Sequence, residues 1–244
     1  MLKESIDFSY LKEKFIIFSY GRCGTTSICN CLNYSNLVCL CEPLKPDFKG
    51  FGPLSKFTET YGGINLRLKE CGNFDGIKHL GCQVNYNFNK HFVSKFGKII
   101  YVSRRNILQS AISMVIAVTD RKWHERPSHY DALDINHLWW QIDHIKKIQS
   151  DFDEIKKIRS NDVLEIVYED FFVSDVDQRV DSLKKIFDFL GKEFVAHDRI
   201  YEILSCSRKV NPENYYCKIP NIKEIEEKFG SCGSLGSLIE PKLF

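Results

Sequence analysis

The chain has 244 residues, and its 34 lysines and arginines against 32 aspartates and glutamates leave a formal net charge of +2. This balance gives no argument for nucleic acid or an acidic membrane surface as a partner. With 43% hydrophobic and 27% charged residues the chain can bury one large core, so we expect a single domain over residues 1–244.

The first stretch, MLKESIDFSYLKEKF, is too polar for a signal peptide, and no apolar run approaches transmembrane length. We therefore expect no membrane insertion and a cytoplasmic location. The ten cysteines include two C-x-C pairs, Cys29/Cys31 and Cys39/Cys41, but no C-x-x-C, so the usual zinc motifs are missing. We expect reduced, mostly buried thiols and no metal site.

The stretch 14–32, KFIIFSYGRCGTTSICNCL, predicts a strand, a tight turn and a helix in succession. Its apolar start is typical of a buried strand, and Gly21 and Gly24 mark the turn into the helix. A helix that starts at such a turn presents free N–H groups and the positive end of its dipole to an anion. Arg22 adds a positive charge and the hydroxyls of residues 25–27 add donors. The sequence therefore predicts a phosphate or sulfate site.

Strands and helices alternate along the rest of the chain. Hydrophobic patterning predicts strands at 36–41, 75–84, 98–103 and 163–168, and helices at 106–120, 135–158 and 175–190. This alternation favours an α/β fold, a P-loop-like parallel sheet with helices on both faces. Residues 45–63 are expected to form a loop, and 197–244 a tail of two shorter helices. In the long helix, we expect one of Trp139 and Trp140 to pack inward.

Ligands of such sheets bind beyond the carboxyl ends of the strands, which places residues 19–26, Glu42 and Arg104–Arg105 around one crevice. Ser113 lies eight residues after Arg105, on the predicted helix that follows. A guanidinium and a hydroxyl in these positions can share one phosphate. The turn itself has neither the lysine and glycine spacing of G-x-x-x-x-G-K-[ST] nor the pattern G-x-G-x-x-G, which disfavours both common nucleotide loops.

The motif G-R-C-G-T-T-S resembles the phosphosulfate-binding loop of sulfotransferases, with Cys23 where that family commonly has serine. Arg105 and Ser113 resemble the family's second signature, in which an arginine and a serine eight residues later hold the donor's 3′-phosphate. The form R-R-N-x-x-Q-S-A-I-S, followed by Trp123-His124, is most similar to the bacterial trehalose 2-sulfotransferase branch. The Asp-Pro that usually follows the arginine is missing here. With C-E-P-L at 41–44, G-I-K at 76–78 and the late F-L-G, the resemblance spans residues 15–191.

The resemblance implies 3′-phosphoadenylyl sulfate as the sulfuryl donor, adenosine 3′,5′-bisphosphate as the product and no required metal. The acceptor would carry its hydroxyl or amine on a small molecule or a glycan, and the trehalose branch suggests a homodimer. Arg22 would stabilise the leaving 5′-phosphate. The donor-binding residues carried over from the two motifs are Arg22, Cys23, Gly24, Thr25, Thr26, Ser27, Arg105 and Ser113.

A general base should take the proton of the acceptor as sulfur is transferred. Glu42 matches the acidic residue implicated as base in the trehalose branch, while a strand-end glutamate is otherwise a solvated loop charge. His79 and His124 are further candidates, although a histidine on a strand is often structural. Lys78 faces either the acceptor or solvent. The loops 45–63 and 121–134 would shape the acceptor site.

Two other functions remain open. A small-molecule kinase with a degenerate phosphate loop would use ATP and magnesium, and the missing Gly-Lys-Ser/Thr speaks against it. A nucleotide-binding module without turnover would keep Arg22 and Arg105 but would need no base.

Overall fold

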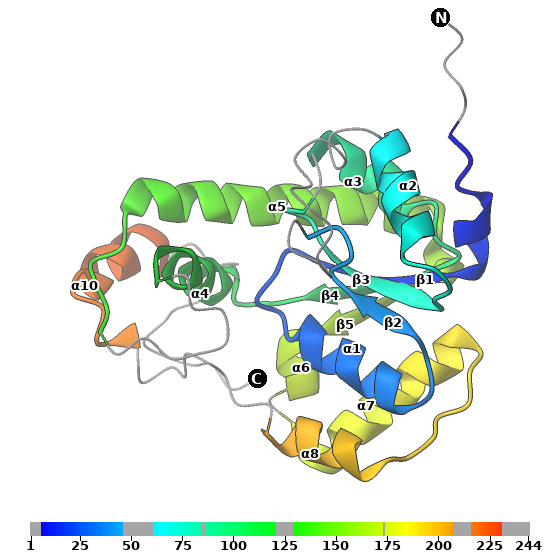
Figure 1. The fold of residues 1–244 in the computed structure, drawn as a ribbon. Helices are drawn as coiled ribbons and strands as arrows, with labels where there is room; N and C mark the ends of the chain where they lie inside the picture. Colours follow the sequence, from blue (N-terminus) through cyan, green and yellow to red (C-terminus); the bar gives the residue numbers. More distant parts are fainter. Residues whose placement is uncertain are drawn as a thin grey trace, which may run out of the picture.

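The structure is a computed structural model that describes residues 6–45, 61–83, 86–120, 129–172, 174–206 and 216–230. Five parallel strands form one sheet in the order β2-β3-β1-β4-β5. The strands are β1 (Phe15–Ser19), β2 (Cys39–Cys41), β3 (Gly76–Leu80), β4 (Lys98–Ser103) and β5 (Val163–Val167). Helices cover both faces of the sheet (Figure 1). The predicted α/β fold with a parallel sheet is confirmed.

Each face of the sheet has its own set of helices, as Figure 1 shows. One face carries α1 (Thr25–Tyr34), α6 (Tyr168–Phe172), α7 (Val176–Leu190) and α8 (Asp198–Cys206). The other carries α2 (Tyr61–Glu70), α3 (Tyr86–Val93) and α5 (Ile135–Ile158). Beyond the end of β4, α4 (Ile107–Asp120) packs against α5, near α10 (Ile222–Ile225). The shorter turns are η1 (Ser9–Glu13), η4 (Ser160–Asp162) and η5 (Glu226–Gly230).

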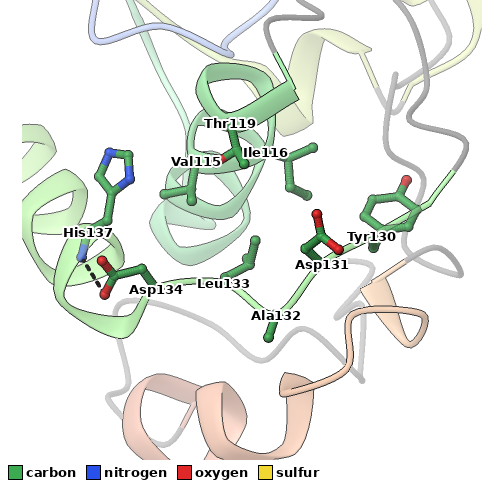
Figure 2. A pocket seen from close by; sticks show the side chains of 9 residues that line it. All are labelled: Val115, Ile116, Thr119, Tyr130, Asp131, Ala132, Leu133, Asp134 and His137. Carbon is green, nitrogen blue, oxygen red and sulfur yellow. Dashed lines mark hydrogen bonds between the residues drawn. The ribbon is translucent and has the colours of Figure 1, made fainter.

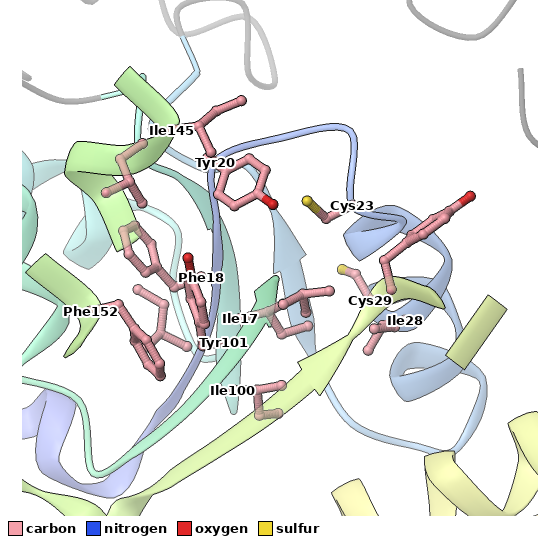
Figure 3. Packing of buried hydrophobic residues seen from close by; sticks show 14 of the residues in the cluster. Ile17, Phe18, Tyr20, Cys23, Ile28, Cys29, Ile100, Tyr101, Ile145 and Phe152 are labelled. Atoms are coloured by element: carbon pink, nitrogen blue, oxygen red, sulfur yellow. The ribbon is translucent and has the colours of Figure 1, made fainter. Parts of the chain in front are cut away.

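The core is centred on β1, whose five residues are all buried. A strand in the middle of a parallel sheet is covered on both faces, so it is apolar throughout instead of alternating. On one side, the ring of Tyr101 stacks on Phe152 of α5 with ring centroids 3.7 Å apart. Ile17 lies with Ile28 of α1 in the same cluster (Figure 3). The core thereby fixes the start of α1 and the end of β1, where the predicted anion site lies.

Helix ends follow the expected capping chemistry. The carboxylate of Asp134 accepts from the N–H groups of Asn136 and His137 at the start of α5, and Asp175 caps α7 in the same way. Gly191 ends α7 in the left-handed conformation, with φ 64°. These capping residues explain why the two helices begin and end almost where the sequence predicts.

Several predicted boundaries were wrong. β2 is shorter than the predicted strand 36–41, since Asn36 has φ 67° and so cannot belong to a strand. The sequence pattern missed α3, and it missed α2, which starts inside the predicted loop 45–63. Both Trp139 and Trp140 are exposed, by 42% and 58%, because the buried face of α5 runs through other positions. No helix in the described ranges is long and apolar enough to cross a membrane.

Candidate anion site

The β1–α1 turn is held in a conformation that few residues adopt. Gly21, Arg22 and Gly24 have φ values of 101°, 57° and 73°. The carbonyl of Gly24 accepts from Ser27 N–H at 3.0 Å and starts α1, leaving the N–H groups of the first helical residues at its open end. Two residues brace the turn: the thiol of Cys23 donates to the Gly21 carbonyl at 3.1 Å, and so does the hydroxyl of Ser110 at 3.3 Å.

The four other residues predicted from the loop motif differ in what they offer a ligand. The Cys23 side chain is buried and turned into the core (Figure 3), where burial raises the pKa of its thiol to about 11. Thr25 is buried as well, whereas Thr26 and Ser27 are half-buried. Cys23 and Thr25 can therefore act only through their backbone, while Thr26 and Ser27 remain partly accessible to a ligand.

Position 24 requires glycine both because its backbone is left-handed and because the neighbouring ring of Phe172 leaves no space for a Cβ atom. A Cβ atom on Gly24 would lie 2.2 Å from Cε2 of Phe172, far inside van der Waals contact. We expect Gly24→Ala to lower the free energy of unfolding by about 3 kcal/mol, from left-handed strain and overpacking together. Gly72 is a matched control, because its φ is 77° and its Cβ would meet nothing within 4 Å. Gly72→Ala should cost about 1 kcal/mol. Equal losses in urea unfolding would contradict this account.

Two of the predicted motifs meet at Arg22. Its Nε donates to Ser113 Oγ on α4 at 2.9 Å, across 91 positions of sequence. Burial lowers the pKa of Arg22; the nearby Arg104 lowers it further and Tyr216 opposes the shift. Arginine stays charged over the ordinary pH range, so this half-buried guanidinium is a fixed positive charge beside the start of α1.

Arg104, expected at the crevice but without a part in donor binding, packs against the turn that carries Arg22. It is buried, and its guanidinium lies 4.6 Å from the ring centroid of Tyr168. Its Nη2 donates to Gln109 at 2.8 Å and its Nη1 donates to the carbonyl of Arg22 at 3.3 Å. Its Nε lies 3.6 Å from a carboxylate oxygen of Glu169. Through its bond to the Arg22 carbonyl, Arg104 thus stabilises the turn, and it adds a second positive charge.

Arg105 points elsewhere. Its side chain is 50% exposed, and Nη2 donates to Asp170 at 2.6 Å. The structure therefore does not bring the guanidinium of Arg105 to Ser113, the pairing on which the predicted phosphate contact depends. An ion pair this exposed contributes little, about 0–1 kcal/mol, and a competing anion can displace it.

A second cluster lies at the ends of β2 and β3. Lys78 is 2% exposed, and its ammonium donates to Thr26 Oγ1 at 2.7 Å and to Glu42 Oε1. The other carboxylate oxygen, Oε2, accepts from Gln83 Nε2 at 2.9 Å. Glu42 itself has φ 56°, an uncommon conformation for a residue with a side chain. Lys78 therefore links the predicted base to the first turn of α1.

Of the two candidate histidines, the structure describes His79. His79 is fully buried: its Nε2 lies 2.9 Å from Asn89 Oδ1, and its ring stacks on Phe18. Burial lowers the pKa of His79 to about 4, so the ring is neutral at pH 7. This setting suits a structural histidine, the alternative that applies to a histidine on a strand. His124, like Trp123, lies outside the described residues.

One hollow of about 150 Å³ lies between α4 and the segment 130–134 (Figure 2). It is lined by Val115, Ile116, Thr119, residues 130–134 and His137. The hollow includes part of the loop 121–134, which was expected to shape an acceptor site.

Within the described ranges, no group of three or more His, Cys, Asp or Glu side chains is arranged to hold a metal ion. The positive groups of the site are instead Arg22, Arg104 and Lys78, together with the N-terminal end of α1. In comparisons with known proteins, no family model and no curated protein matches this chain.

Proposed function

We propose that this protein is a sulfotransferase that moves a sulfuryl group from 3′-phosphoadenylyl sulfate to a hydroxyl of a small molecule or carbohydrate. The proposal joins the resemblance of the two sequence motifs to the geometry of the site. A sulfuryl group carries less charge than a phosphoryl group, so fixed positive groups and positioning can suffice where a kinase relies on magnesium.

The observation that carries the proposal is the bond between Arg22 and Ser113. The two residues come from the two motifs that the resemblance assigns to the donor, and they meet at the start of α1. Within the described residues, three non-glycine residues have positive φ: Arg22, Glu42 and Asn36. Backbone strain of this kind persists where the surrounding structure enforces it, and it often marks functional sites. Two of the three are residues to which we assign chemistry.

Glu42 is the proposed base. As the acceptor oxygen attacks sulfur, the bond from sulfur to the bridging oxygen of the 5′-phosphate breaks, and the acceptor proton passes to the carboxylate. Lys78 and Gln83 each occupy one lone pair of Glu42, which leaves further lone pairs to accept that proton. Arg22 and the N–H groups at the start of α1 would hold the leaving 5′-phosphate.

The test is a binding measurement with adenosine 3′,5′-bisphosphate, with ATP–Mg²⁺ as the comparison. Ligand at about 100 times its dissociation constant stabilises the folded state by about 2.7 kcal/mol. For a chain of this length we expect the melting temperature to rise by about 5–10 °C. A rise with ATP–Mg²⁺ alone would favour a kinase, and no rise with either nucleotide would overturn the proposal.

A further inference from the structure

Three thiols lie close together between α1 and β2, next to Lys78. The sulfur atoms of Cys29 and Cys39 lie 3.4 Å apart, and both side chains are buried. Cys41 lies two residues further along the same strand, and Lys78 Nζ donates to its Sγ at 3.7 Å. All three cysteines are free thiols.

The contact between Cys29 and Cys39 is built by the fold. Asn33, one helical turn after Cys29, accepts from the N–H of Cys39 at 2.8 Å and donates to its carbonyl at 3.0 Å. This two-bond clasp fixes the strand against the same face of α1 that carries Cys29. The Cys29 thiol also lies 3.5 Å from the Cys39 carbonyl. The hydrogen bonds between the Asn33 side chain and the backbone of Cys39 therefore hold the two sulfur atoms in contact.

We infer that Cys29 and Cys39 form a reversible disulfide, a modification site that ties α1 to β2 and does not rest on the proposed function. A disulfide has a sulfur–sulfur distance of about 2.05 Å, so closure from 3.4 Å needs a movement of about 1.4 Å.

The oxidant is a two-electron acceptor such as hydrogen peroxide. The Cys29 thiolate attacks one peroxide oxygen, the O–O bond breaks, and one water leaves after protonation. The Cys39 sulfur then attacks the sulfenic sulfur, the S–O bond breaks, and a second water leaves. Two thiols are oxidised and one peroxide is reduced to two waters. The hydrogen bond with Cys39 raises the pKa of the Cys29 thiol, the contact with Cys41 opposes this shift and burial adds to it, so little thiolate is present near neutral pH and the reaction with peroxide is slow.

The position of the pair gives the disulfide a consequence. Cys29 follows Thr26 by three residues and Cys39 precedes Glu42 by three, and Lys78 bonds to both Thr26 and Glu42. A disulfide would draw together the two elements that this lysine bridges. Oxidation is therefore coupled to the geometry of the Lys78 cluster.

The experiment maps disulfides in the folded full-length chain after treatment with hydrogen peroxide and blocking of free thiols. Trypsin leaves both cysteines on one peptide, since no lysine or arginine lies between residues 23 and 44. Chymotrypsin, which can cut after Tyr34, separates them, and fragmentation of the linked peptides in the mass spectrometer assigns which cysteines are joined. We expect Cys29 linked to Cys39, released by dithiothreitol.

Cys31→Ser is the matched control, because Cys31 is equally buried on the same helix and burial alone raises its pKa to about 12. This variant should keep the link, whereas Cys39→Ser should lose it. Mapping of the unaltered chain decides the matter even where Cys39→Ser fails to fold. Absence of a linked peptide, or a link from Cys29 to Cys41 instead, would overturn the inference.

Discussion

Replacing Arg22 with alanine is expected to weaken binding of adenosine 3′,5′-bisphosphate by about 100-fold, or about 2.7 kcal/mol. Arg22 is a half-buried cation beside the start of α1, held there by its bond to Ser113. In a site shielded from water, a hydrogen bond from a charged donor to a phosphate is among the stronger polar contacts. Isothermal titration with the bisphosphate measures the loss, and the unliganded melting temperature reports whether the fold is intact.

Two further variants sharpen this measurement. Arg22→Lys keeps the charge but loses the planar donor set, so its affinity should fall between those of the alanine variant and the unaltered protein. Arg199, an exposed arginine of α8 paired with Glu202, is the matched control, and Arg199→Ala should leave affinity unchanged. If Arg22→Ala binds as tightly as Arg199→Ala, the anion site does not lie at this turn.

At Arg105 the expectation from the resemblance and the contact in the structure differ. The resemblance implies that it contacts the 3′-phosphate, yet its guanidinium bonds to Asp170. Since that exposed pair is weak, we expect the arginine to exchange partners when the nucleotide binds, and Arg105→Ala to lose about 10-fold in affinity. An unchanged affinity would show that the Asp170 pairing persists and that the phosphate contact comes from other groups.

The sequence predicted those parts of the fold that depend on local pattern. The unbroken apolar run of β1 and the long periodicity of α5 are strong local signals, and helix ends are marked by the capping carboxylate of Asp134 and the left-handed backbone of Gly191. Short elements behaved differently. α2 has a weakly amphipathic sequence with two glycines near its start, and its helicity depends on packing that a local pattern cannot reveal.

The sequence predicted the β1–α1 loop of the candidate site, but it did not predict which residues of other elements contact that loop. Lys78 meets Thr26 and Glu42 because β3 lies between β2 and β1, with Lys78 in register with Cys41 and Ile17. Strand order is a property of the whole sheet, so no spacing in the sequence encodes it. The choice between Arg104 and Arg105 is of the same kind. Adjacent residues at a strand end point in different directions, and only the packed neighbours decide which one turns inward.

Glu42→Gln should lower turnover by about 10²- to 10⁴-fold while changing nucleotide affinity little. An amide keeps the shape of the side chain and can still accept from Lys78, but it cannot take a proton from the acceptor. The substitution also leaves the buried Lys78 ammonium without its counter-charge, which lowers stability. Melting temperature and bisphosphate affinity must therefore be measured beside turnover, which is followed as sulfated product from a panel of hydroxyl-bearing acceptors.

Gln83→Leu is the matched control for this last prediction. It removes the bond to Glu42 Oε2 but leaves the carboxylate and its contact with Lys78 in place. We expect turnover to fall less than about 10-fold, because the base is only less well oriented. A Glu42→Gln protein that binds the bisphosphate and turns over as fast as the Gln83→Leu protein would remove Glu42 from the chemistry. A chain that binds the nucleotide tightly but sulfates no acceptor would instead favour a binding module, for which a carboxylate held by Lys78 serves only to anchor β2 against α1.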